Sequence, residues 1–478
     1  MSAADDLCFL DAAELTRRIA AKTVSATEVM SAHLERIAAV NPALNAIVTL
    51  DAGGALAAAR AADAAQARGD ALGPLHGLPV AHKDIFVTRG MRTTFGSPLF
   101  RDFVPAADSI TVERQRNAGA IAVGKTNVPE FGAGSQTFNT VFGATRNPYD
   151  LSRTCGGSSG GSAVALAAGM VALADGSDLG GSLRNPASFC NVVGLRPSIG
   201  RVPQYPIEDA WGALNVAGPL GRTVGDVALL LSVQAGADPR DPLAVPVDGA
   251  RFRAPLERDV RGTRIAWSSD LGGLPVEPAA AAVLEAQRAV FERLGCALEA
   301  ATPDLSGADE VFQVLRGVTF AGRYGELIER HPAAFKESIV TNVAFGRGLS
   351  AERIAAAHKL HAQCYLRMSE FFERFDFLVA PVSQVLPFSV DEPYPTAIEG
   401  VAMENYMGWM RSCYLITVSG HPAISVPAGF TRDGLPVGIQ IVGPYRDEWS
   451  LLQLAWAFEA ATHTGRRRPP AVPNRTKT

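Results

Sequence analysis

Apolar residues recur at helical spacing in the first part of the chain. The positions that fall roughly on one helical face are Leu15, Ile19, Val24, Val29 and Ile37. Ser25 and Glu28 form a Ser-x-x-Glu capping box, a pattern typical of a helix N-terminus. We therefore predict helix over residues 8–70, with a second, alanine-rich helix at Ala55–Ala71.

Short apolar runs alternate with helical patterns over the rest of the chain. The predicted strands are 78–82, 120–123, 263–267, 297–300, 377–380, 423–427 and 437–442. The predicted helices are 110–118, 161–169, 278–294, most of 307–375, and 450–463. Residues 131–200 are interpreted as loop-rich, apart from the helix at 161–169. This alternation predicts an α/β fold with a large, mostly buried sheet.

Composition narrows the class of protein. The chain has 478 residues, 47% of them hydrophobic and 19% charged, with a net charge of −4. This hydrophobic content excludes a mainly disordered chain. The slightly negative net charge gives no reason to expect a general attraction to nucleic acid or anionic membranes. We expect no membrane span, because no apolar run of about 18 residues occurs. Asp5 and Asp6 stand where a secretory signal needs positive charge, so we expect a cytoplasmic protein.

The six cysteines are scattered along the chain. They are Cys8, Cys155, Cys190, Cys296, Cys364 and Cys413. No Cys-x-x-Cys pair occurs, so neither a zinc site nor a disulfide framework is indicated. We expect free thiols in a reducing compartment.

Two motif matches do not fit their sequence context. Residues 119–126 match the phosphate-loop pattern, but a predicted helix precedes Gly119 and a predicted strand fills the positions where the loop belongs. Residues 156–160 match the Gly-x-Ser-x-Gly nucleophile elbow, but the preceding residues 146–155 are polar and contain proline rather than forming an apolar strand. A nucleotide-binding protein and an α/β-hydrolase therefore rank as minor hypotheses.

The glycine–serine tract Gly156–Pro186 is the most informative segment. Paired glycines let the backbone approach a ligand closely, and consecutive N–H groups in such turns can converge on one oxygen. This is the arrangement that an oxyanion hole requires. A flexible linker is disfavoured because an apolar helical segment, Ala163–Met170, lies inside the tract.

The tract resembles the signature of the amidase signature family of serine hydrolases. The segment Gly77–Asp84 resembles the lysine-bearing motif of the same family, and further similar segments are 124–135, 142–150, 375–381 and the C-terminal region. Ser158 follows Lys83 by 75 residues, and Ser182 follows Ser158 by 24, as expected in the family. The resemblance covers nearly the whole chain.

The resemblance implies one large domain spanning 1–478, with a central mixed sheet covered by helices on both faces. Within it we expect N-terminal helices at 1–70, the signature core at 75–235 and a variable helical region at 307–375.

The resemblance also implies a Ser–Ser–Lys triad. Ser182 would be the nucleophile, Ser158 the bridging serine after a cis Gly157–Ser158 peptide bond, and Lys83 the base. The backbone amides expected to bind the oxyanion are those of Leu179, Gly180, Gly181 and Ser182. Candidate substrate-binding residues beside the site are Phe131, Gly132 and Gly134. No metal or organic cofactor is implied, and a homodimer is consistent with the family.

The proposed base places a physical demand on Lys83. A lysine takes a proton only when it is neutral, which requires its pKa to fall from about 10.4 to near 7.4, or roughly 4 kcal/mol. Burial supplies shifts of this size. If the strand continues, Asp84 points to the opposite face and need not keep Lys83 charged.

The functional hypothesis is hydrolysis of a small carboxylic amide through an acyl-enzyme. One alternative is the glutamine-hydrolysing subunit of a tRNA-dependent amidotransferase. Against it, the acidic chain has no basic stripe beyond Arg466–Arg468, which are interpreted as a solvated end. A second alternative is a urea, carbamate or ester hydrolase of the same family.

The substrate itself is not readable from the residues. Specificity is expected in the 310–345 and 400–414 stretches. The aromatic residues Tyr406, Trp409 and Tyr414 either line a pocket or pack helices. Asp178 and Arg184, which flank Ser182, are interpreted as a hydrogen-bonded pair that keeps the loop rigid rather than as substrate contacts.

Overall fold

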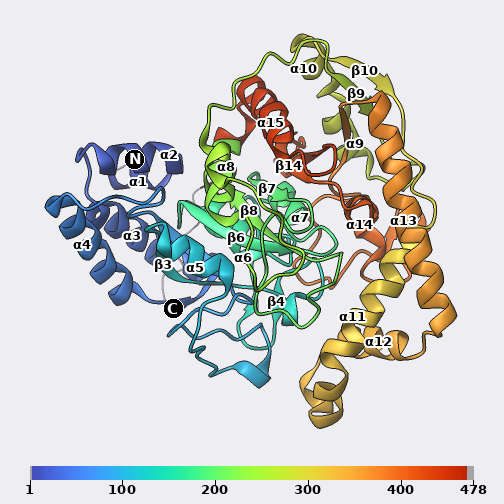
Figure 1. Cartoon of the computed structure of the whole chain (residues 1–478), viewed down its shortest axis with the longest axis horizontal. Coiled ribbons are helices and arrows are strands. Elements are labelled where there is room, and N and C mark those ends of the chain that lie inside the picture. The colour runs from blue at the N-terminus through green and yellow to red at the C-terminus, as the bar shows by residue number, and fades with distance from the viewer. Residues whose placement is uncertain (1–2, 471–478) are drawn as a thin grey trace.

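The centre of the molecule is a mixed β-sheet that combines strands from the beginning, the middle and the end of the chain (Figure 1). The computed structural model describes residues 3–470. Within them the sheet has eleven strands, in the order β1-β3-β2-β6-β8-β7-β14-β15-β11-β9-β10. Their bounds are β1 (Ile47–Leu50), β2 (Pro79–Lys83), β3 (Ile121–Thr126), β6 (Leu173–Asp178), β7 (Val193–Arg196), β8 (Val216–Gly221), β9 (Arg264–Trp267), β10 (Ala297–Ala300), β11 (Phe377–Pro381), β14 (Ala423–Phe430) and β15 (Pro436–Val442).

Parallel and antiparallel pairing occupy different parts of this sheet. β2 runs parallel to both β3 and β6, and β9 runs parallel to β10 and β11. The strands between β6 and β11 pair with antiparallel neighbours. Two small hairpins lie outside the sheet: β4 (Phe138–Asn139) with β5 (Gly143–Ala144), and β12 (Ala397–Ile398) with β13 (Val401–Ala402). The α/β fold with a central mixed sheet is confirmed.

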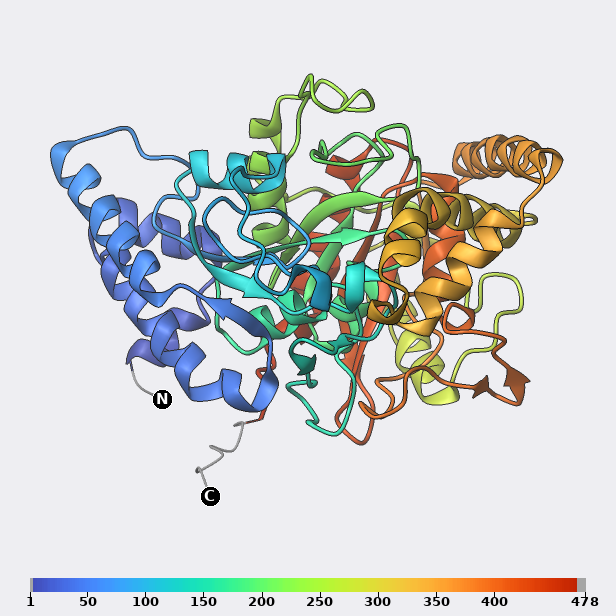
Figure 2. The ribbon, with the colours of Figure 1, turned by 90° about the horizontal axis from the view of Figure 1, so that it is seen from below.

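Helices surround the sheet. They are α1 (Ala3–Cys8), α2 (Ala12–Ala20), α3 (Ala26–Leu44), α4 (Ala52–Arg68), α5 (Ile110–Asn117), α6 (Gly160–Ala167), α7 (Arg184–Phe189), α8 (Val224–Gln234), α9 (Pro278–Glu285), α10 (Arg288–Arg293), α11 (Ala308–Arg330), α12 (Glu337–Arg347), α13 (Ala351–Arg374), α14 (Arg411–Ser419) and α15 (Glu448–Thr462). The helices α1–α4 and α11–α13 lie at opposite ends of the molecule (Figures 1 and 2). No helix of the described residues is long and apolar enough to cross a membrane.

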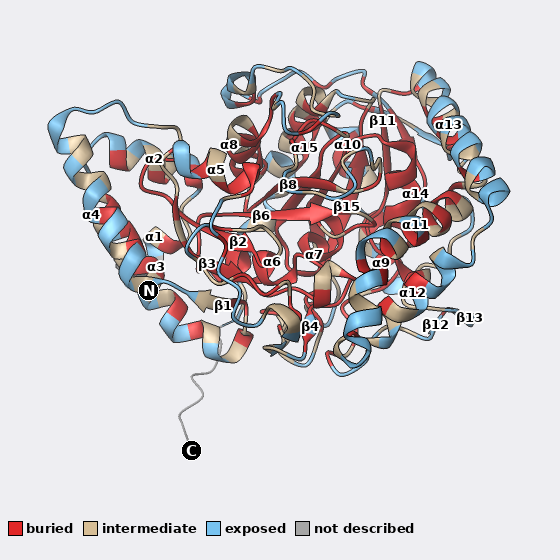
Figure 3. Cartoon of the chain, turned by 60° about the horizontal axis from the view of Figure 1, so that its bottom comes forward, coloured by how far each residue is buried: buried red, intermediate tan, exposed pale blue. Residues whose placement is uncertain are grey.

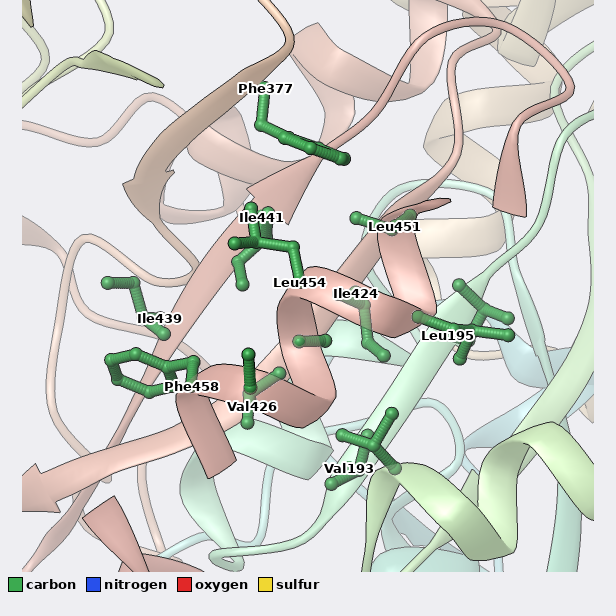
Figure 4. Close-up of a cluster of buried hydrophobic side chains, with 14 of the residues drawn as sticks. Val193, Leu195, Phe377, Ile424, Val426, Ile439, Ile441, Leu451, Leu454 and Phe458 are labelled. Atoms are coloured by element: carbon green, nitrogen blue, oxygen red, sulfur yellow. The ribbon is translucent and has the colours of Figure 1, made fainter. Parts of the chain in front are cut away.

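The two faces of the sheet follow from the alternation of side chains along its strands. On β15, Ile439 and Ile441 belong to an apolar cluster with Leu451 and Leu454 of α15 (Figure 4). Gln440, between them in sequence, points the other way and accepts a hydrogen bond from Arg184 of α7. Helices α15 and α7 therefore cover opposite faces, and the strands and helices between them are largely buried (Figure 3).

The N-terminal region is more broken than its periodicity predicted. The helical region expected over 8–70 is divided into α2, α3 and α4, with the strand β1 between α3 and α4. The alanine-rich helix expected at Ala55–Ala71 corresponds to α4, and the capping box of Ser25 and Glu28 is present at the start of α3. The strand was missed because Ile47–Leu50 is short and its apolar residues also fit a helical face. Its pairing with β3 decides its conformation.

The loop-rich interpretation of residues 131–200 is also wrong in part. This stretch contains β6, α7 and β7 in addition to α6. The sequence of β6, Leu-Ala-Asp-Gly-Ser-Asp, is rich in residues that are rare in strands, but all six residues are buried in the sheet. The helix predicted at 278–294 is divided into α9 and α10. Residues 1–2 and 471–478 of the expected domain lie outside the described residues.

The phosphate-loop match is a strand, as its context predicted. Ile121–Thr126 forms β3, and Gly119 has a φ of +89° just after α5. The Lys125 side chain is buried and donates hydrogen bonds to Thr88 Oγ1 at 2.9 Å and Thr93 Oγ1 at 3.2 Å. This lysine therefore fixes local structure. The match to the nucleophile elbow also fails, because no strand immediately precedes Ser158.

Candidate active site

Lys83 lies at the end of β2, where the parallel neighbour β6 brings polar groups beside it. Its side chain is fully buried, and Nζ lies 2.7 Å from Ser158 Oγ and 2.9 Å from Ser177 Oγ. No carboxylate of the described residues lies within 4.0 Å of its ammonium group. Both hydrogen-bond partners are neutral hydroxyls, which can bond the uncharged amine as readily as the ammonium.

Burial lowers the pKa of Lys83 to about 7, although the more distant carboxylates of Asp178 and Asp175 act to raise it. Asp84 lies apart from Nζ, as the strand alternation predicted. Its carboxylate accepts hydrogen bonds from Thr94 and interacts with Lys125. Near neutral pH a substantial fraction of Lys83 is therefore able to accept a proton.

Ser158 stands in a tight loop just before α6, and the Gly157–Ser158 peptide bond is cis, as expected. Side chains hold the two preceding carbonyls: Ser135 Oγ donates to Gly157 O at 2.7 Å, and Thr137 Oγ1 donates to Gly156 O at 2.8 Å. The close approach requires glycine, because a Cβ at Gly160 would lie 2.2 Å from Thr137 Oγ1. The glycines of the tract thus allow the chain to place Ser158 against Lys83.

Ser182 lies in the loop between β6 and α7 and is half-buried, in contrast to Ser158, which is 2% exposed. The backbone N–H of Ser159 donates to Ser182 O at 3.3 Å and holds the two serine loops together. Among the described residues, no hydrogen bond joins the hydroxyls of Ser158 and Ser182. The accessible serine is therefore the one that can meet a substrate from solvent.

A buried ionic network shapes this loop. Asp178 accepts hydrogen bonds from the backbone N–H groups of Gly181 at 2.8 Å and Leu183 at 3.0 Å. Its carboxylate also forms ion pairs with Arg184 at 2.9 Å and Arg196 at 3.3 Å. Burial by itself raises the pKa of Asp178, but the two guanidinium groups outweigh it and hold this pKa well below its usual range. Asp178 and Arg184 form the rigidifying pair that we expected.

The network corrects one of the expected oxyanion groups. The N–H of Gly181 is bonded to Asp178, so this amide is not directed at an open position. The amides of Leu179, Gly180 and Ser182 have no hydrogen-bond partner among the described residues. These three remain the candidates for binding a negatively charged oxygen beside Ser182.

The expected substrate-binding glycines lie on a second loop beside the serines. A Cβ at Gly132 would lie 3.5 Å from Ser158 Oγ, whereas a Cβ at Gly134 would lie 3.6 Å from Lys336 Nζ. Phe131 stacks with Phe335 and contacts Tyr324 of α11. This loop therefore joins the lysine–serine cluster to the helices α11 and α12.

The three aromatic candidates separate into different environments. Trp409 is 1% exposed and stacks on Phe189 in an apolar cluster, so it packs the core. Tyr414 stacks on Phe312 with ring centroids 4.1 Å apart. Tyr406 and Tyr414 also line a cavity of about 790 Å³ between α11, α12 and residues 401–411. Both interpretations of the aromatic set are thus correct for part of it.

Sequence reasoning missed Ser177 and the groups around Asp175. Asp175 accepts a hydrogen bond from the backbone N–H of Lys83 at 2.8 Å and lies 2.5 Å from His82 Nδ1. Asp175 and Ser177 are two residues apart on β6 and so share a face beside Lys83. The alternation of polar residues in Asp-Gly-Ser-Asp was the available signal, but that segment was interpreted as loop.

The cysteines and the C-terminal arginines have the environments expected from the sequence. All six cysteines are buried, and none of them forms a disulfide within the part of the chain that the structure describes. Arg466–Arg468 are exposed, as expected of a solvated end.

Comparison with known proteins places this geometry in a family. The family model for amidases matches residues 28–452. The chain is 37% identical to one subunit of the glutamyl-tRNA(Gln) amidotransferase of Moorella thermoacetica, with 97% of this chain and 99% of the relative covered. It is 35% identical to an acylamidase of Rhodococcus erythropolis, with 97% and 98% covered.

A solved structure agrees with these relatives. A bacterial aryl acylamidase of the amidase signature family superposes with a TM-score of 0.90 at 30% identity, with 95% of this chain and 96% of that chain covered. The chain therefore belongs to the amidase signature family and is an amide-hydrolysing enzyme.

Proposed function

We propose that Ser182 is the nucleophile, Ser158 the proton relay and Lys83 the general base of this amide hydrolysis. The single observation that carries the assignment is the 2.7 Å contact between Lys83 Nζ and Ser158 Oγ in a fully buried site without a directly paired carboxylate. A serine hydroxyl is a weak nucleophile until a base takes its proton, and a neutral lysine is such a base.

The reaction then proceeds in two halves. The Ser182 oxygen attacks the amide carbonyl while its proton passes through Ser158 to Lys83. The amides of Leu179, Gly180 and Ser182 stabilise the oxyanion. As the carbon–nitrogen bond breaks, the proton returns through Ser158 to the leaving nitrogen, which leaves an acyl group on Ser182. Water, deprotonated by the same relay, attacks this ester and releases the acid.

Substitution of the three residues tests the assignment. Ser182→Ala and Lys83→Ala are each expected to lower kcat by about 10⁴-fold or more. The reason is that catalytic residues that act together lose most of their joint effect when any one of them is removed. Turnover would be measured on a panel of aryl, aliphatic and amino-acid amides. Ser152→Ala is the matched control, since its hydroxyl bonds Asp150 at the surface.

An independent measurement keeps the result interpretable. A fluorophosphonate probe is expected to label the wild-type enzyme and Ser152→Ala, but not Ser182→Ala. Circular dichroism of each variant checks folding. Full turnover or full labelling in Ser182→Ala would refute the assignment of the nucleophile.

A second candidate function is glutamine hydrolysis as one subunit of a tRNA-dependent amidotransferase. It is favoured by the 37% identity to the Moorella thermoacetica protein over nearly its whole length. Under this proposal the chain hydrolyses glutamine and copurifies with partner subunits. Under the first proposal it hydrolyses simple amides on its own, so assays on the purified chain separate the two.

Two expectations about the cellular context remain predictions. These are a cytoplasmic location and assembly into a homodimer. Gel filtration with light scattering measures the second directly.

A further inference from the structure

Helix α11 lies against both loops of the proposed active site. Near its start, Phe312 Cζ lies 2.9 Å from the position that a Cβ on Gly180 would occupy. Three turns later, the Tyr324 ring lies 4.9 Å from that of Phe131, the residue before Gly132. Arg316 lies between Phe312 and Tyr324 along the helix and is 4% exposed. Its side chain is therefore buried on the helix that lies against both loops.

The surroundings of Arg316 supply polar contacts but no countercharge. The guanidinium donates hydrogen bonds to Asn342 Oδ1 and Tyr406 Oη, both neutral acceptors. It stacks on Phe320 at 3.9 Å. Among the described residues, no carboxylate lies within ion-pair distance of it. By contrast, the buried Arg184 and Arg201 each face a carboxylate, Asp178 and Glu448 respectively.

A second cation adds to the positive charge on this side of the site. Lys336, immediately before α12, donates from Nζ to Ala133 O beside Gly134. Burial lowers the pKa of Lys336 to about 8, with the Glu130 carboxylate opposing this and Arg316 adding to it. The Glu130 carboxylate thus acts on Lys336, whereas no carboxylate forms an ion pair with Arg316 in the described part of the chain.

The cavity beside Arg316 connects this charge to a space that a ligand can fill. Asn342 and Tyr406, the two acceptors of Arg316, line the cavity of about 790 Å³. Four carboxylates, those of Asp309, Glu310, Glu337 and Glu404, also line the cavity. Asp309 and Glu310 are 46% and 39% exposed and face Arg411 and Arg353, and Glu337 and Glu404 are exposed as well. Exposed charges are screened by water and salt much more than buried ones, so these carboxylates compensate the buried guanidinium of Arg316 only weakly.

We propose that Arg316, with Tyr406 and Asn342, forms a subsite for a substrate carboxylate, and that this enzyme prefers amides bearing a carboxylate group. The inference rests on the proposed function of Ser182, because it places the anion within the same substrate. A buried guanidinium without a countercharge is costly, and a bound carboxylate removes that cost. The guanidinium has five N–H donors in a planar fork, so donors remain for a carboxylate beyond those bonded to Asn342 and Tyr406.

Matched substrate pairs test the preference. One pair is N-succinyl-4-nitroanilide and its neutral succinamide analogue, and the other is 4-acetamidobenzoate and 4-acetamidobenzamide. The wild type is expected to show at least a tenfold higher kcat/KM for the carboxylate member of one pair. Arg316→Met is expected to reduce this ratio by about 10- to 100-fold, the worth of hydrogen bonds to a charged group. Arg323→Met, on the same helix but paired with the exposed Glu208, is expected to keep the ratio.

Further variants separate recognition from folding. Arg316→Lys keeps the charge and is expected to retain part of the preference, whereas Arg316→Gln is expected to lose it. A purely structural role of Arg316 predicts instead that the ratio is the same in every variant that folds. That result, or a wild-type preference for the neutral members, overturns the proposal.

A binding measurement distinguishes failure of this inference from failure of the proposed function. Calorimetric titration of the Ser182→Ala variant with the four amides reports affinity without turnover. Tighter binding of a carboxylate member that disappears in Ser182→Ala/Arg316→Met supports the subsite even if Ser182 is not the nucleophile. Equal affinities for the carboxylate and neutral members of both pairs overturn the subsite, even if Ser182→Ala abolishes hydrolysis.

Discussion

The loop of residues 178–184 and the helix pair α11–α12 meet at the same site but are held together by different forces. In the loop, one buried carboxylate, Asp178, accepts two backbone amides and pairs with two buried arginines. Across the helix pair, contacts are mostly apolar, and in the ion pair of Glu329 with Arg347 the two side chains are 62% and 47% exposed.

This difference assigns separate tasks to the two regions. Transition-state stabilisation needs donors fixed to a fraction of an ångström, and buried charge-assisted hydrogen bonds provide that rigidity. Substrate selectivity needs side chains that can be exchanged without disturbing the reacting groups. The helices α11 and α12, held by apolar packing and screened surface charges, meet that need.

Removal of the buried charge in the loop should have the largest effect. Asp178→Asn keeps the size of the side chain but leaves Arg184 and Arg196 buried without a countercharge. We expect the free energy of unfolding to fall by about 3–5 kcal/mol, as measured by denaturant titration. Amide hydrolysis should be lost as well, because the loop that carries Ser182 is no longer held.

The matched change in the helical region should alter the free energy of unfolding only slightly. Glu329→Gln removes the partner of Arg347 at an exposed site, and a loss of about 0–1 kcal/mol in the free energy of unfolding is expected. Equal losses in the two variants would contradict the contrast between the regions.

A packing change at the helix crossing should have an intermediate effect. A Cβ at Gly346 of α12 would lie 2.0 Å from Gly317 O of α11, so Gly346→Ala must push the two helices apart. We expect a loss of about 1–3 kcal/mol in stability and a raised KM, with kcat less affected.

Gly322→Ala on α11 is the control for that change. No atom lies within 4 Å of its added Cβ, so a gain of about 0.4–1 kcal/mol is expected. If Gly346→Ala behaves like Gly322→Ala, the close crossing does not hold the helices α11 and α12 in place.

The smallest effect concerns the pH profile of the proposed active site. Under the proposed mechanism only neutral Lys83 accepts a proton, so kcat/KM should rise as the pH increases through about 7. The Asp175 carboxylate raises the pKa of Lys83, so Asp175→Asn should move this acid limb to lower pH.

Asp84→Asn is the control for the pH profile. Asp84 is adjacent to Lys83 in sequence but bonds Thr94, and its charge is not among those that shift Lys83. The acid limb should stay in place. A limb that moves upward in Asp175→Asn would contradict the role given to burial and to this carboxylate.

Much of the fold was readable from hydrophobic patterning. Strands with apolar residues, such as β9, β11 and β15, were predicted close to their observed bounds. The strands of the central sheet that escaped prediction were β1, whose apolar run is short, β6, whose buried positions carry Asp175, Ser177 and Asp178, and also β7 and β8. Polar residues in a central strand are stable only when partners such as Lys83, Arg184 and Arg196 satisfy them, and those partners come from elsewhere in the chain.

The candidate site shows the same division. The glycine–serine tract and the lysine segment, through their resemblance to a known signature, pointed to Lys83, Ser158 and Ser182. Neither could show that the Gly181 amide turns to Asp178 or that Ser177 is a second partner of Lys83. Arg316 gave no signal at all, because a single arginine in an amphipathic helix is ordinarily a surface residue.

The sequence by itself determined the chemistry of this protein: which serines and which lysine are available, and the glycines that let the backbone bring them together. Only the tertiary structure decided which charges are compensated. Burial and countercharge depend on residues distant in the chain, such as Asp178 with Arg196, or Arg316 with Asn342 and Tyr406. The pKa of Lys83 and the uncompensated charge of Arg316 follow from that packing, because electrostatic energies depend on where water is excluded.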